Sequence, residues 1–167
     1  MTGTIASFVV LNTCNTNSID SVESGPLILL AEDSDDDAFF FERALAKCTI
    51  PCGIIRARNG KIAIEKLQKA FNGAPHERVP DLIFLDLKMP VMSGFEVLEW
   101  LKQNNPNPPF KVIVLSGSND HEDRDRAKAL GGVDYIVKPI GSKELARRIH
   151  ALTAQNSSDS EKKGEQV

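Results

Sequence analysis

Four short apolar runs, each followed at once by a polar or charged residue, constrain the fold of this sequence more than any other feature. The clearest run is Leu-Ile-Phe-Leu at 82–85, and the others occupy 27–31, 111–115 and 135–137. Runs of this length between turn residues are typical of strands that are buried on both faces of a parallel sheet. In open α/β sheets, ligands bind outside the carboxyl ends of such strands. The residues that follow the four runs are therefore the first candidates for a functional site.

These residues carry complementary charges. Glu32 and Asp33 follow the first run, Asp86 the second, Ser116 the third and Lys138 the fourth. Three carboxylates at one edge of a sheet repel one another and raise the pKa of at least one of them, unless a cation is present. Oxygen ligands without His or Cys suit Mg²⁺. The sequence therefore predicts a magnesium site next to a hydroxyl group and an ammonium group.

The same set of residues suggests a reaction. Asp86 is a candidate nucleophile, because a carboxylate can attack a phosphoryl group and form an aspartyl phosphate. Mg²⁺, the Lys138 ammonium and the Ser116 hydroxyl would then stabilise the charge on the phosphoryl oxygens.

Segments with helical periodicity separate the runs. Phe41, Leu45 and Cys48 share one helix face after a cap at Ser34, and a weaker strand is predicted over 52–58. The three carboxylates at 35–37 suit the helix dipole, and we interpret them as a solvated helix start rather than as ligands. The order of elements predicts a doubly wound α/β fold, with a five-stranded parallel sheet and five helices on its two faces.

Length and composition indicate one domain and exclude several classes of protein. A chain of 167 residues can bury one sizeable core, which we expect over 26–153. We expect 1–25 to be a flexible extension and 154–167 a disordered polar tail. The net charge of −3 does not favour a nucleic-acid partner.

The sequence also predicts a cytoplasmic protein. It has no apolar stretch near the roughly 20 residues that span a bilayer, and no basic residue precedes the short apolar patch at 8–11. Cys14, Cys48 and Cys52 are spaced neither as a metal site nor as a disulfide framework, which indicates reduced thiols.

Taken together, the four strand-end motifs resemble the receiver domain of two-component response regulators, over about 27–152. They are Leu30-Ala31-Glu32-Asp33, Leu85-Asp86-Leu87-Lys88-Met89-Pro90 with Gly94, Leu115-Ser116-Gly117-Ser118 and Tyr135-Ile136-Val137-Lys138-Pro139. The resemblance implies a flavodoxin-like fold and phosphotransfer to Asp86 from a sensor histidine kinase or a histidine phosphotransfer protein. It implies Mg²⁺ held by Asp33, Asp86 and the backbone carbonyl of Lys88, with Glu32 acting through water.

The resemblance also implies a switch. Ser116 would turn toward the phosphoryl group, Tyr135 would move inward, and the surface of the fourth helix, fifth strand and fifth helix would repack. That surface is a candidate homodimer face. The Lys138–Pro139 peptide bond is expected to be cis. The loop over 73–80 and the Asp-rich helix start resemble the regulators that partner bacterial phytochrome kinases.

Two alternatives stay open at this point. A phosphatase of the haloacid dehalogenase type also uses a strand-end aspartate with Mg²⁺, but it needs a second aspartate where this chain has Lys88. A pseudo-receiver would bind partners without phosphorylation. Because only a short segment follows 152, we expect no output domain, and a phosphoacceptor that assists its own phosphotransfer and dephosphorylation and signals by protein contact rather than an enzyme.

Overall fold

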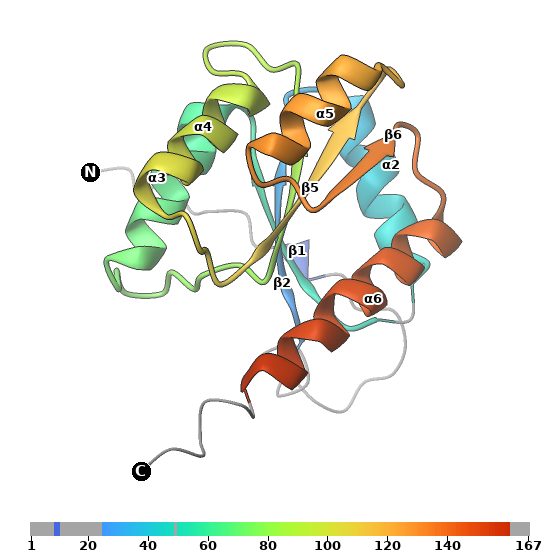
Figure 1. The fold of residues 1–167 in the computed structure, drawn as a ribbon. Helices are drawn as coiled ribbons and strands as arrows, with labels where there is room; N and C mark the ends of the chain where they lie inside the picture. The colour runs from blue at the N-terminus through green and yellow to red at the C-terminus, as the bar shows by residue number, and fades with distance from the viewer. Residues whose placement is uncertain (1–8, 11–24, 49, 161–167) are drawn as a thin grey trace, which may run out of the picture.

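A computed structural model describes residues 9–10, 25–48 and 50–160, and it has a central sheet between two layers of helices (Figure 1). The sheet order is β1-β3-β2-β4-β5-β6. The strands are β1 (Val9–Val10), β2 (Leu27–Ala31), β3 (Gly53–Ala57), β4 (Leu82–Asp86), β5 (Lys111–Ser116) and β6 (Asp134–Val137). The helices are α2 (Asp35–Ala46), α3 (Gly60–Phe71), α4 (Gly94–Asn104), α5 (His121–Ala129) and α6 (Ser142–Ser160).

The predicted parallel sheet of five strands with five helices is confirmed, from β3 across to β6. A short antiparallel strand adds to it, because Val9 pairs with Ile54 and Val10 with Gly53. The rest of the expected N-terminal extension, apart from Gly25, lies outside the described residues.

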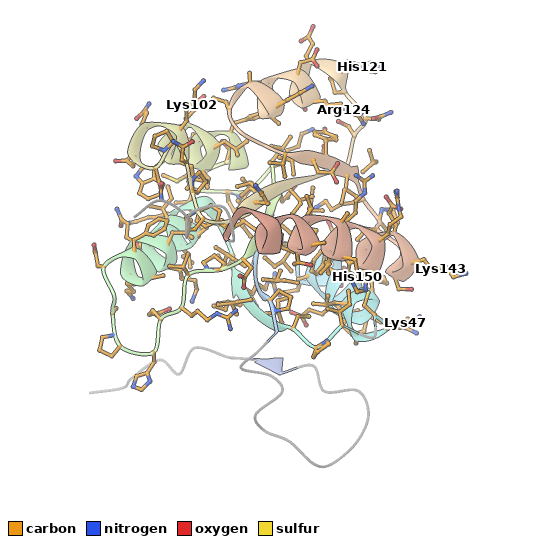
Figure 2. The ribbon with its side chains drawn as sticks, turned by 60° about the horizontal axis from the view of Figure 1, so that its bottom comes forward. Lys47, Lys102, His121, Arg124, Lys143 and His150 are labelled. Atoms are coloured by element: carbon orange, nitrogen blue, oxygen red, sulfur yellow. The ribbon has the colours of Figure 1, made fainter. Side chains whose placement is uncertain are left out.

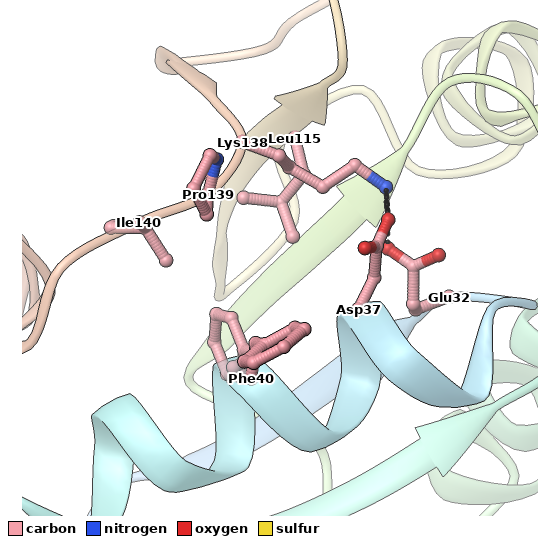
Figure 3. A pocket seen from close by; sticks show the side chains of 8 residues that line it. Glu32, Asp37, Phe40, Leu115, Lys138, Pro139 and Ile140 are labelled. Atoms are coloured by element: carbon pink, nitrogen blue, oxygen red, sulfur yellow. Dashed lines mark hydrogen bonds and ion pairs between the residues drawn. The ribbon is translucent and has the colours of Figure 1, made fainter.

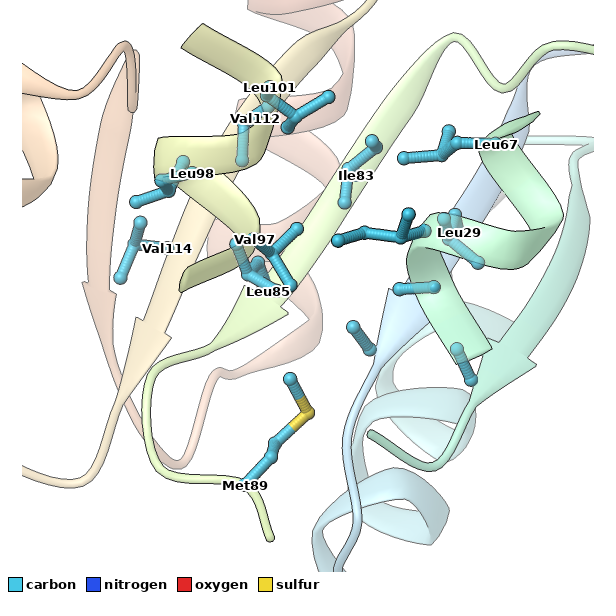
Figure 4. Close-up of a cluster of buried hydrophobic side chains, with 14 of the residues drawn as sticks. Leu29, Leu67, Ile83, Leu85, Met89, Val97, Leu98, Leu101, Val112 and Val114 are labelled. Carbon is cyan, nitrogen blue, oxygen red and sulfur yellow. The ribbon is translucent and has the colours of Figure 1, made fainter. Parts of the chain in front are cut away.

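Two apolar layers hold the helices to the sheet. Alternate strand residues such as Leu29, Ile83 and Val112 face α3 and α4, as Figure 4 shows for the cluster on that side. Their neighbours, such as Leu30 and Phe84, face α2 and α6. Burial on both faces explains why the strands appear in the sequence as continuous apolar runs.

Helix α5 is held by fewer apolar contacts. It buries only Ala127 among its own residues, and its first and last turns are charged. Polar contacts from α4 supplement this packing, since Lys102, labelled in Figure 2, donates from Nζ to the Ala129 carbonyl at 3.1 Å. Arg126 also pairs with Glu99. The charged sequence of α5 therefore fits a helix that lies on the surface.

The C-terminal boundary differs from the prediction. We expected the domain to end at 153 and a disordered tail to follow it, whereas α6 continues to Ser160. The apolar spacing that located the helix ends at Leu152, whereas an existing helix extends by adding one hydrogen bond per residue. Residues 161–167 lie outside the described part. Among the described residues, no helix is long and apolar enough to cross a membrane.

Candidate functional site

The register of the parallel strands brings the predicted residues to one edge of the sheet. Ala31 pairs with Leu85, Asp86 with Leu115, and Ser116 with Val137. The order β3, β2, β4, β5 and β6 places the point where the strand order reverses between β2 and β4. Open α/β sheets bind ligands at that point.

Three carboxylates meet there. Each of Glu32, Asp33 and Asp86 offers an oxygen, and these oxygens lie within 4.8 Å of one another. Glu32 is 1% exposed and Asp86 4% exposed, whereas Asp33 is half-buried. The structure thus assembles the predicted metal-binding carboxylates, although their role as ligands stays a prediction.

Burial perturbs this cluster. Desolvation raises the pKa of Asp86, and the nearby Lys138 ammonium offsets only part of that effect. Desolvation also raises the pKa of Glu32; the hydrogen bond from Lys138 opposes this change and the charge of Asp86 adds to it. Carboxylates that are costly to ionise are stabilised by a divalent cation, so the donor set fits Mg²⁺.

Lys138 reaches into the cluster from the end of β6. Its Nζ donates to Asp37 Oδ2 at 2.7 Å and to Glu32 Oε2 at 2.9 Å (Figure 3). It also lies 3.5 Å from Asp86 Oδ2. Burial alone would lower the pKa of Lys138, but the hydrogen bonds to the two carboxylates outweigh it and raise that pKa. The predicted cis peptide bond between Lys138 and Pro139 is confirmed. Lys138 therefore carries a firmly held positive charge.

Asp37 is the site residue that sequence reasoning missed. The interpretation of the carboxylates at 35–37 as a solvated helix start agrees with the structure for Asp36, which is exposed. It also agrees for Asp35, which forms exposed ion pairs with Arg56 and Arg58. Asp37 instead binds Lys138. A signal was available, because Asp37 lies four residues before the buried Phe41 and so shares the inward face of the helix.

Ser116 and Tyr135 are linked through one intervening residue. The buried Ser116 accepts a hydrogen bond on Oγ from the Ser118 amide at 3.2 Å. The half-buried Tyr135 donates its hydroxyl proton to the Ser118 carbonyl at 3.1 Å, and the Arg124 guanidinium lies 5.0 Å from its ring centroid. Movement of either side chain must therefore alter a bond to Ser118.

The loop after Asp86 closes the site. The Lys88 amide hydrogen bonds to the Asp86 carboxylate, while the Lys88 side chain is exposed. The Gly94 amide donates to the Leu87 carbonyl at 3.1 Å, which fixes the start of α4 against the end of β4. The Lys88 carbonyl as a metal ligand stays a prediction.

These features define a class: a doubly wound α/β protein with an acidic pocket at its switch point and a lysine anchored beside the phosphoacceptor candidate. The chain matches the response regulator receiver domain over residues 28–150 and belongs to that family. This membership confirms the predicted resemblance and favours it over the phosphatase alternative.

Known relatives agree with this membership. The chain is 37% identical to a probable cyclic di-GMP phosphodiesterase of Vibrio cholerae over 123 residues, which span 74% of this chain but only 25% of that protein. Among solved structures, the phosphorylated cyanobacterial phytochrome response regulator RcpA has a TM-score of 0.64 and 31% identity, with coverage of 77% of this chain and 91% of RcpA. The Mn²⁺-bound response regulator Rcp1 has a TM-score of 0.61 and 32% identity, with coverage of 76% and 91% respectively.

Proposed function

We propose that this chain accepts a phosphoryl group on Asp86 from a histidine kinase or a histidine phosphotransfer protein. An Asp86 carboxylate oxygen attacks the phosphorus of a phosphohistidine, the P–N bond breaks, and the imidazole leaves with the electron pair. The observation that carries the proposal is the position of Asp86, which is 4% exposed and lies with Glu32 and Asp33 in one cluster and 3.5 Å from Lys138.

The proposed cofactor is Mg²⁺. Asp33, Asp86 and the Lys88 carbonyl would hold the ion, with Glu32 acting through water. When bound, Mg²⁺ neutralises charge that develops on the phosphoryl oxygens. The raised pKa values of Glu32 and Asp86 support this proposal, because they show a buried negative charge that the described side chains compensate only in part.

The proposed output begins at Ser116. If its hydroxyl turns to donate to the phosphoryl group, the Ser118 amide loses its present acceptor. The Ser118 carbonyl is also the acceptor for Tyr135, so the change reaches the surface formed by α5, β6 and α6. This is a local bonding change that biases a two-state surface, and the same surface is the proposed homodimer face.

An aromatic pair on α2 supports a protein as the phosphoryl donor. Phe39 is 57% exposed and Phe40 56% exposed, and their rings make an edge-to-face contact. Phe40 also lines a small cavity with Lys138 and Asp37, so the pair borders the entrance to the site. Exposed apolar groups of this kind mark interaction surfaces. A kinase partner would place the protein in the cytoplasm.

The test is the intact mass of the protein after incubation with acetyl phosphate, with Mg²⁺ or with a chelator, alongside Asp86→Asn. We expect the wild-type protein to gain one phosphoryl group only when Mg²⁺ is present, and the variant to gain none. No gain by a folded wild-type protein in Mg²⁺ would contradict the proposal and favour the pseudo-receiver alternative.

A further inference from the structure

The short hydrogen bonds of Lys138 do not involve the proposed phosphoacceptor. Its ammonium binds Asp37 at 2.7 Å and Glu32 at 2.9 Å, whereas the Asp86 oxygen is 3.5 Å away. An ammonium has three donors on one compact charge. For Lys138 to approach a phosphoryl group on Asp86, at least one of the two short contacts must lengthen or break.

The two carboxylates that hold Lys138 differ in how easily they can release it. The Glu32 side chain is 2% exposed, so loss of the lysine would leave a buried charge without its cation. The Asp37 side chain is 41% exposed, and water can replace the lysine there at small cost. The contact with Asp37 is therefore the one that yields.

The structure around Asp37 is consistent with a contact that holds Lys138 in the unphosphorylated protein and that can break. The Asp37 amide donates to the Ser34 hydroxyl at 3.2 Å, which fixes the carboxylate on the first turn of α2. Beside it, Asp37, Phe40, Lys138 and Pro139 line a cavity of about 30 Å³, so the contact between Asp37 and Lys138 is not closely packed on that side (Figure 3).

We infer that Asp37 is a positioning residue that retains Lys138 in the unphosphorylated protein and competes with the phosphoryl oxygens for it. The inference rests on the proposed phosphorylation of Asp86. Asp37 lies outside the cluster formed by Glu32, Asp33 and Asp86, and it acts by setting how readily Lys138 is released to the reacting atoms.

The test compares rate constants for phosphorylation by acetyl phosphate in saturating Mg²⁺. Asp37→Asn removes the charge that competes for Lys138, so we expect the reaction to be roughly three- to fivefold faster. Asp37→Glu, which keeps the carboxylate, should return the rate toward that of the wild-type protein. The matched control is Asp36→Asn, one residue away, where the side chain is exposed and makes no hydrogen bond or ion pair within the described part of the chain.

A second arm separates positioning from a general effect of charge. In a Lys138→Ala background, Asp37→Asn should no longer change the rate. An effect of Asp37→Asn that persists without Lys138 would overturn the inference. The inference would also fail if the wild-type protein is phosphorylated and Asp37→Asn reacts no faster than it does. If the wild-type protein itself gains no phosphoryl group, the proposed function fails and takes the inference with it.

Discussion

At the residue scale, Val91 in the loop after Asp86 has an unfavourable backbone conformation. Its φ is +69°, and the Met92 amide donates to the Pro90 carbonyl at 2.7 Å, so Val91 is the centre of a γ-turn. A β-branched residue with positive φ is strained by about 1–2 kcal/mol. Val91 is also 78% exposed, so its side chain gains little from packing in return.

Val91→Asn should therefore stabilise the protein by about 1 kcal/mol, because Asn tolerates positive φ. Urea unfolding monitored by circular dichroism would measure the change in the free energy of unfolding. The matched control is Val133→Asn, which replaces an exposed valine outside the positive-φ region and should change stability by less than about 0.5 kcal/mol. Equal effects of the two substitutions would contradict the assignment of strain to Val91.

Residues also show where prediction from sequence succeeds. The position of Glu32, Asp33, Asp86, Ser116 and Lys138 at one edge was predictable because each lies at the end of a parallel strand, while their roles stay predictions. Asp37 was missed because its position in the first turn of a helix is explained by a favourable interaction with the helix dipole alone. Its contact with Lys138 depends on a residue 101 positions away, which local pattern does not report.

At the element scale, the start of α4 is packed directly on the end of β4. A Cβ atom on Gly94 would lie 2.3 Å from the Asp86 carbonyl oxygen, which is backbone and cannot move aside as a side chain can. The close approach fixes the loop between Asp86 and α4, together with the hydrogen bond from the Gly94 amide to Leu87. The helix start therefore helps to position Asp86.

We expect Gly94→Ala to destabilise the protein by about 2–3 kcal/mol, since the clash exceeds the roughly 1 kcal/mol that alanine gains in a helix. Gly117→Ala is the matched control, because a Cβ there meets nothing within 4 Å and its φ is outside the positive range. Thermal or urea unfolding of the two variants would measure the difference. A neutral or stabilising Gly94→Ala would show that α4 can shift away from β4 at little cost.

Elements with a strong apolar pattern were predicted better than those without one. The strands β2, β4 and β5 follow from buried runs, and helices such as α2 follow from amphipathic spacing. The strand β1 and the last turns of α6 have no such pattern, since β1 comprises two residues and α6 continues beyond Leu152. Helix α5 also has no such apolar pattern, and its start is marked instead by the cap residue Asp120.

At the scale of the whole molecule, the buried carboxylates link stability to pH and to metal. The pKa of Asp86 is raised in the folded protein, so the folded state holds a proton more tightly than the unfolded state. The stability that this group contributes is therefore fully present below the pKa of the unfolded state. It is lost as pH rises through the higher pKa of the folded state. Glu32 acts in the same direction. Without metal, the site thus costs stability at neutral pH.

Asp86→Asn should accordingly be more stable than the wild-type protein at neutral pH in a chelator, by on the order of 1 kcal/mol. This advantage should shrink as pH falls through the raised pKa of Asp86, because the wild-type carboxyl then takes up its proton. Mg²⁺ should reverse the order at neutral pH, since a free concentration tenfold above Kd stabilises the wild-type protein by about 1.4 kcal/mol and the variant by less. Urea unfolding across this pH range, with Mg²⁺ or chelator, measures all three differences, with the exposed Asp125→Asn as control. Parallel pH profiles of the wild-type protein and Asp86→Asn would show that Asp86 does not link stability to protonation, and a Mg²⁺ effect retained by the variant would place the ion elsewhere.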